Sequence, residues 1–120
     1  MTTLKASGST PIQKLAGAIA GTIRSEGEVT VSLVGSSALN QAIKASIIAR
    51  RFLNIDKNPS DIYIQPEFVI QNFAEPSDEK SEVTTIALHI YRIEYNPERA
   101  VSTDGIYDNR TAQPNSAEGQ

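Results

Sequence analysis

Residues 35–52 read G-S-S-A-L-N-Q-A-I-K-A-S-I-I-A-R-R-F, and this stretch decides the fold of the chain. Its small side chains recur at helical spacing as Ala38, Ala42, Ala45 and Ala49. A bulkier stripe beside them consists of Leu39, Ile43 and Ile47. We therefore predict a helix that lies very close to a sheet or to another helix through its small side.

The start and the outer face of this predicted helix are polar. Ser36 or Ser37 can cap the helix by accepting hydrogen bonds from its first amide groups. The outward positions are Asn40, Gln41, Lys44 and Arg51, with Arg50 near the edge. A helix start with amide side chains and cations can hold a phosphate backbone. A solvated face of an ordinary core helix explains the same pattern, and composition alone favours that interpretation.

Length and composition limit the possible classes of protein. The chain has 120 residues, of which 39% are hydrophobic, and this suits one domain with a modest core. It has no cysteine, which excludes disulfides, thiolate metal sites and thiol nucleophiles. We find neither a signal peptide nor an apolar run of transmembrane length, so we expect a cytoplasmic protein that does not enter the membrane.

The net charge of −3 argues mildly against nucleic-acid binding, because nucleic-acid-binding domains usually carry a basic footprint. The distribution of charge weakens that argument. Cations gather in the first half of the chain, at Lys5, Lys14, Lys44, Arg50 and Arg51. Acidic residues gather in one predicted turn, at Glu75, Asp78, Glu79 and Glu82. The sequence is therefore compatible with a weak local positive patch.

Periodicity predicts five further elements around the central helix. They are a strand over 2–7, a helix over 12–26, and strands over 28–34, 61–73 and 82–95. Thr10 is expected to cap the first helix, with Pro11 at its first position and Gly27 just beyond its end. Gly17 and Gly21 lower helix propensity, which suggests close approach to another backbone, and we favour tight packing within the molecule as the explanation.

The resulting order is β-α-β-α-β-β. It predicts a two-layer α+β domain, with a four-stranded mixed sheet and two helices on one face. Pro66 interrupts the strand predicted over 61–73 and indicates an edge position or a bulge there. The domain is expected over 1–95, with a hairpin tip over 75–80 and a disordered tail over 96–120. Apolar surface left uncovered by one copy makes a homodimer a reasonable expectation.

Nothing in the sequence supports catalysis. His89 is the single histidine, and its neighbours supply no Ser-His-Asp constellation. Gly17 and Gly21 lie inside a helix, so they do not form a phosphate-cradling loop. The spacing of Asp56 and Asp61 fits a polar turn better than a metal loop. We predict a protein that is not an enzyme and has no cofactor and no small-molecule substrate.

The residues quoted above resemble a known family. Residues 35–45 and 48–52 are similar to the G-A-G-A-L-N-Q-A-x-K-A and I-A-R-G-F motifs of the stage V sporulation protein S family. Residues 15–21, L-A-G-A-I-A-G, resemble its first helix, and residues 4–7, L-K-A-S, resemble its opening. The similarity covers about residues 4 to 93. The family is similar in fold to the Alba-type chromatin proteins, which dimerise and bind DNA or RNA.

The resemblance implies an Alba-like dimer that binds DNA or RNA in sporulation or related gene regulation in bacteria. The implied contacts lie in the first loop, at the start of the second helix and at the hairpin tip. The candidate residues are Ser9, Lys14, Ser36, Ser37, Asn40, Gln41, Lys44 and Arg51. Three departures from the pattern stand out: the first loop lacks paired lysines, Arg51 replaces a glycine, and the hairpin tip is acidic.

Two hypotheses follow. One is a nucleic-acid-binding dimer with modest, salt-sensitive affinity. The alternative is a protein-interaction or structural module that keeps the fold but has lost nucleic-acid binding, in line with the acidic hairpin and the net charge.

Overall fold

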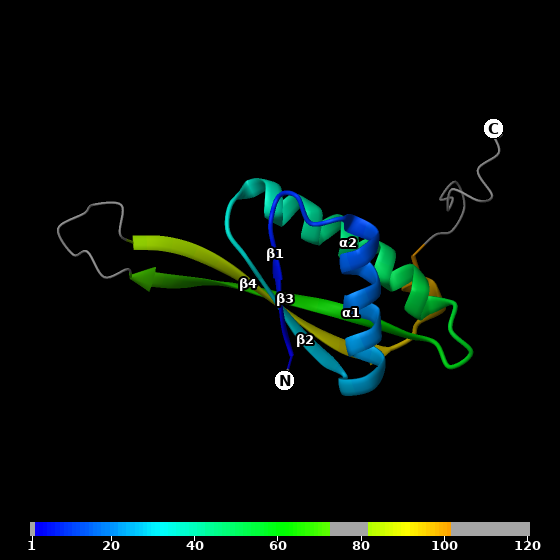
Figure 1. Cartoon of the computed structure of the whole chain (residues 1–120). Coiled ribbons are helices and arrows are strands. Elements are labelled where there is room, and N and C mark those ends of the chain that lie inside the picture. The colour runs from blue at the N-terminus through cyan, green and yellow to red at the C-terminus, as the bar shows by residue number, and fades with distance from the viewer. Residues whose placement is uncertain (1, 73–81, 102–120) are drawn as a thin grey trace.

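The structure is a computed structural model that describes residues 2–72 and 82–101. Its elements follow one another as β-α-β-α-β-β (Figure 1). They are β1 (Thr3–Ala6), α1 (Ile12–Glu26), β2 (Glu28–Leu33), α2 (Ser36–Asn54), β3 (Ser60–Asn72) and β4 (Glu82–Glu94), followed by a short 3-10 helix, η1 (Pro97–Arg99). All six predicted elements are confirmed, each within two residues of the predicted bounds.

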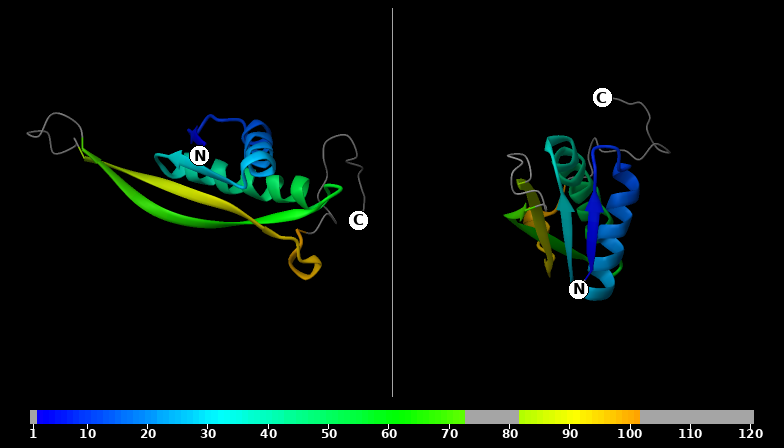
Figure 2. Two further views of the ribbon diagram at one scale, coloured as in Figure 1. Left: turned by 90° about the horizontal axis from the view of Figure 1, so that it is seen from below. Right: turned by 60° about the vertical axis from the view of Figure 1, so that its left-hand side comes forward.

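The sheet has the strand order β1-β2-β4-β3. β1 and β2 are parallel, whereas β4 is antiparallel to both of its neighbours, so the sheet is mixed. Both helices cover the same face of this sheet (Figure 2). The predicted two-layer α+β class is therefore confirmed. The connection between the parallel strands β1 and β2 runs through α1, as a crossover connection must.

Alternation along the strands places the core on the helix side of the sheet. On β2, Val29, Val31 and Leu33 are at most 1% exposed, and they pair in register with Ile90, Leu88 and Ile86 of β4. The four alanines of α2 complete this core, and all are fully buried. Their small size allows α2 to approach the layer below it closely, as the sequence predicts.

The start of α2 differs from the prediction. The N-cap residue is Gly35, with φ of 92°, and neither Ser36 nor Ser37 caps the helix with its side chain. A positive φ at this turn favours glycine, which has no Cβ to clash with the backbone. The serines therefore fall inside the first turn of α2, and their hydroxyl groups are exposed at its surface.

Thr10 does not cap α1 either. Pro11 occupies the N-cap position, and the helix begins one residue later, at Ile12. The Thr10 hydroxyl instead accepts a hydrogen bond from the backbone amide of Ser7, at 2.8 Å. The predicted end of the helix is confirmed, because Gly27 has φ of 82° and its amide donates to the carbonyl of Ile23.

The predicted close packing at Gly17 and Gly21 is wrong. Both glycines are exposed, and a Cβ built on either of them would meet no atom within 4 Å apart from its chain neighbours and the adjoining backbone of α1. The close contact on α1 is made instead by Ala16 and Ala20, which are fully buried. The glycines lie on the neighbouring, outward strip of the helix, so they lower helix propensity without serving the core.

Replacing these glycines should therefore stabilise the fold. We expect Gly17→Ala and Gly21→Ala each to raise the free energy of unfolding by about 0.5–1 kcal/mol, because alanine restricts the unfolded chain and fits the open space. Urea unfolding measures the effect. Gly27→Ala is the control and should lower stability, because its φ is positive. A loss of stability on Gly17→Ala would contradict the assignment of this strip as uncovered surface.

β3 lies at one edge of the sheet, which confirms the edge position predicted from Pro66. β3 and β4 form a long hairpin that reaches beyond the helices (Figure 1). The hairpin tip predicted over 75–80 lies outside the described residues. Part of the segment that the sequence assigns to the tail is ordered: η1 covers Pro97–Arg99, and the amide of Val101 donates a hydrogen bond to Asn54 Oδ1 of α2. Residues 102–120 lie outside the described residues, so the tail stays a prediction there.

Candidate nucleic-acid interface

The loop between β1 and α1, residues 7–10, is a compact turn held by its own hydroxyl groups. The Ser7 amide donates to Thr10 Oγ1 at 2.8 Å, and the Thr10 amide donates to the Ser7 carbonyl at 3.2 Å. The Ser9 amide donates to Ser7 Oγ, also at 3.2 Å. Such local side-chain bonds give the backbone an alternative to helix or sheet ladders, so the turn keeps a defined shape on the surface.

This loop rests on the first turns of α2. Gln41 Nε2 donates a hydrogen bond to the carbonyl of Thr10 at 2.9 Å. Gly8 lies so close to α2 that a Cβ at position 8 would be 2.8 Å from Ser37 Cβ, a distance that real side chains essentially never show. Gly8 therefore allows two segments that are 29 residues apart in sequence to share one surface.

The starts of α1 and α2 thus lie on either side of the same loop (Figure 1). Within the described residues, neither helix has a side-chain cap. Uncapped helix starts present free backbone N–H groups and the positive end of the helix dipole. Lys14 in the first turn of α1 and Lys44 on α2 are both exposed, and no described carboxylate forms an ion pair with them.

The structure brings most of the predicted site residues onto these meeting elements. They are Ser9 in the loop, Lys14 on α1, and Ser36, Ser37, Asn40, Gln41 and Lys44 on α2. All are exposed except Gln41, which is half-buried because it bonds the loop. Arg51 does not join this group, because it is half-buried and lies about four turns, or about 22 Å, along α2 from Ser36.

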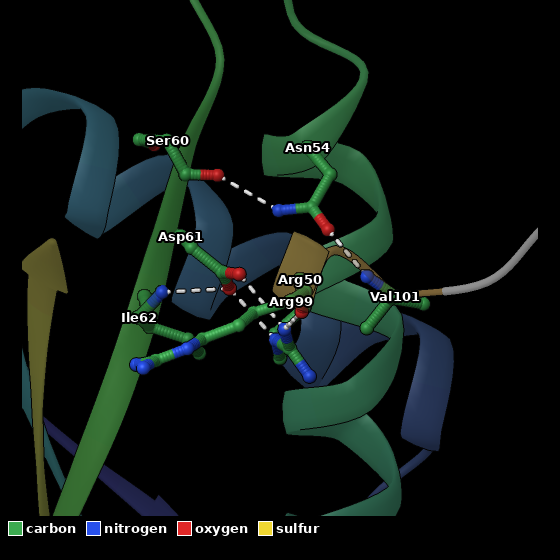
Figure 3. Close-up of polar contacts among 7 residues, drawn as sticks. All are labelled: Arg50, Asn54, Ser60, Asp61, Ile62, Arg99 and Val101. Carbon is green, nitrogen blue, oxygen red and sulfur yellow. Dashed lines mark hydrogen bonds and ion pairs between the residues drawn. The ribbon is translucent and has the colours of Figure 1, made fainter. Parts of the chain in front are cut away.

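Arg50 stabilises the fold and does not belong to the group of exposed residues around the loop. Its Nε and Nη2 donate to the two carboxylate oxygens of Asp61 at 2.7 and 2.8 Å, and Nη2 also donates to the carbonyl of Arg99 (Figure 3). Burial alone would raise the pKa of Asp61, but hydrogen bonds from Arg50 and from the Ile62 amide outweigh it, and that pKa is lowered. The Asp61 hydrogen bonds likewise raise the pKa of Arg50.

Asn54 completes this cluster at the end of α2. It is 8% exposed, its Nδ2 donates to the carbonyl of Ser60, and its Oδ1 accepts from the amide of Val101 (Figure 3). Sequence spacing does not reveal this cluster, because Arg50 and Asp61 are 11 residues apart, on a helix and a strand, and follow no helical spacing. A bidentate arginine–carboxylate pair of this kind ties α2, β3 and residues 99–101 together.

The lowered pKa of Asp61 predicts a loss of stability in acid. A carboxyl group whose pKa is lowered by folding stabilises the fold above its unfolded pKa, about 3.9, and this contribution disappears as the pH falls through the folded pKa. We expect Asp61→Asn to lower the free energy of unfolding by about 2 kcal/mol at pH 7, because Arg50 loses its carboxylate partner. This difference from the wild type should shrink below about pH 4.

Urea unfolding at a series of pH values from 7 to 2.5 measures this difference. Asp56→Asn is the matched control, because the ion pair of Asp56 with Arg24 is more exposed, and its removal should cost less than about 1 kcal/mol. A difference between wild type and Asp61→Asn that stays constant down to pH 2.5 would contradict this account.

The other polar residues considered in the sequence have structural partners. Asp56 accepts two hydrogen bonds from Arg24, at 2.8 and 3.0 Å, and these raise the pKa of that guanidinium. His89 bridges three strands on the face away from the helices, since Nδ1 meets Thr30 Oγ1 at 3.0 Å and Nε2 meets Glu67 Oε2 at 2.6 Å. Residues 2–72 and 82–101 contain no group of three potential metal ligands. No helix in the same ranges is long and apolar enough to span a bilayer.

Comparison with known proteins decides the family. A family model described as "Stage V sporulation protein S (SpoVS)" matches residues 2–93. The chain belongs to the stage V sporulation protein S family. Among solved structures, the chain is similar to Alba from Thermoplasma volcanium, with a TM-score of 0.50 and 12% sequence identity. The match covers 77% of this chain and 99% of the other, and at this identity it supports the Alba-like fold alone.

Proposed function

We propose that this member of the stage V sporulation protein S family is a non-catalytic, cytoplasmic protein that binds DNA or RNA as a homodimer and acts in sporulation or related gene regulation. The observation that carries the proposal is the meeting of two uncapped helix starts at one loop, with Lys14 and Lys44 exposed nearby. Backbone amides at helix starts bind phosphate oxygens, and the lysines add charge that releases counterions.

The polar side chains at this surface suit contact with the nucleic-acid backbone. Ser9, Ser36, Ser37 and Asn40 are exposed, and hydroxyl and amide groups of this kind account for many contacts to phosphate and sugar. Few cations are present, so the affinity should be modest and sensitive to salt. The Alba fold of the domain supports the proposal at the level of architecture.

Fluorescence anisotropy with labelled duplex DNA and with single-stranded RNA, at low and at moderate salt, tests the proposal. Binding that weakens as salt rises supports it. No binding of the wild-type chain to either nucleic acid at low salt would contradict it and would favour the alternative, a protein-interaction module. The net charge of −3 is the observation that keeps that alternative in view.

The contribution of Lys44 can be measured through salt dependence. If Lys44 of each copy in a dimer contacts one duplex phosphate, Lys44→Ala should reduce the slope of log K against log salt concentration by about 1.8, because each lost contact is worth about 0.9. Lys57→Ala is the matched control, since Lys57 is an exposed lysine in the loop after α2. Equal slopes for Lys44→Ala and wild type would place the bound phosphates elsewhere.

The proposed dimer rests on uncovered apolar side chains. Ile43 and Ile47 lie one turn apart on α2 and are 41% and 45% exposed, and Phe68 on β3 is 73% exposed. Phe68 pairs in register with Ile86, which packs against the core, so Phe68 faces the same side of the sheet as the helices. These three exposed apolar side chains on the helix side of the sheet favour a second copy as their cover.

Light scattering tests this proposed dimer. We expect the wild-type chain to have the mass of a dimer and Ile47→Glu to shift it toward the monomer, because burying an unpaired carboxylate in an apolar contact is costly. Ser25→Glu, an exposed position on α1, is the control and should leave the mass unchanged. A monomeric wild-type chain at micromolar concentration would contradict the dimer.

A further inference from the structure

The side-chain amide of Gln41 is already used inside the molecule. Its Nε2 donates to the carbonyl of Thr10 at 2.9 Å, and the side chain is half-buried. By contrast, its neighbour Asn40 is exposed, and no hydrogen bond of its side chain occurs within the described residues. The two adjacent amides therefore have different roles: Asn40 is available to a ligand, whereas Gln41 is committed to the loop between β1 and α1.

This one hydrogen bond acts on the whole loop. Thr10 closes the turn, because its amide bonds the Ser7 carbonyl and its hydroxyl accepts from the Ser7 amide. The hydrogen bond from Gln41 to the Thr10 carbonyl therefore also restrains Ser7 and the start of α1, which follows at Ile12. The close approach of Gly8 to Ser37 is the second point of contact between the loop and α2.

We infer that Gln41 is a positioning residue for nucleic-acid binding, which holds the loop and the start of α1 against the start of α2. The inference rests on the proposed function. Two segments that are far apart in sequence bind the same stretch of nucleic-acid backbone more tightly when their relative position is already fixed. A preformed arrangement removes the entropy cost of ordering the loop when the ligand binds.

A double-mutant cycle separates this role from direct contact. Gln41→Met keeps the length of the side chain and removes the donor, and it should weaken binding by about 3- to 10-fold, the value of one ordinary hydrogen bond. Lys14 lies beyond the loop on α1, whereas Lys44 lies on the same helix as Gln41. We expect the effect of Lys14→Ala to shrink in the Gln41→Met background, and that of Lys44→Ala to stay unchanged.

A residue that contacts the ligand directly would give a different result. The effect of its substitution on binding would add to that of Lys14→Ala and would couple to that of Lys44→Ala. The free protein would be unaltered. Hydrogen exchange of the Ser9 and Thr10 amides in the free protein therefore provides a second measurement. Exchange should speed up in Gln41→Met, because both amides are bonded within the loop that Gln41 holds.

Gly8→Ala supplies an independent variant in case Gln41→Met does not fold. Its Cβ would lie 2.8 Å from Ser37 Cβ, so the loop must move away from α2 while Gln41 stays intact. We expect the same loss of affinity and the same faster exchange. If the wild-type chain binds nucleic acid, unchanged exchange would overturn this inference but not the proposed function. Additive effects of Gln41→Met and Lys14→Ala would do the same. A wild-type chain that binds no nucleic acid would instead overturn the proposed function.

Discussion

The contact between the alanine stripe of α2 and the layer beneath it is the constraint on which the rest of the structure depends. Four fully buried alanines leave no bulk between this helix and its neighbours, so its position is fixed to within the tolerance of a packed core. Larger side chains there would force the helix outward at a cost of about 1–3 kcal/mol each. The position of α2 in turn determines whether the loop before α1 can contact the first turns of α2.

Contacts at both ends of α2 fix the helix relative to its neighbours. At its start, Gly8 and Gln41 bring the loop onto the helix, and at its end, Arg50 binds Asp61 of β3. The first contact lies at an exposed surface with uncapped helix starts, whereas the second involves Asp61, a residue that is only 3% exposed. The two ends of one helix therefore differ in role: one presents groups to solvent, and the other anchors the helix to the sheet.

The elements, their order and the buried face of α2 could be predicted from the sequence, because periodicity and the alanine spacing are local signals. Local signals failed where a residue's role depends on distant partners. The sequence predicts Ser36 or Ser37 as the cap of α2, but Gly35, with its positive φ, occupies the N-cap position. Gly17 was expected in a close contact, but the contact falls on its neighbour Ala16. The bond from Gln41 to the loop joins segments that sequence spacing cannot relate.

The central claim is that nucleic acid binds where the loop after β1 meets the start of α2. The most direct test is an NMR titration of the 15N-labelled full-length chain with an unlabelled duplex DNA and with a single-stranded RNA at low salt. The account predicts that the amide shifts of at least one titration concentrate in residues 7–14 and 35–44. Shifts concentrated instead around His89 on the open face of the sheet, or around Arg50 at the far end of α2, would contradict it.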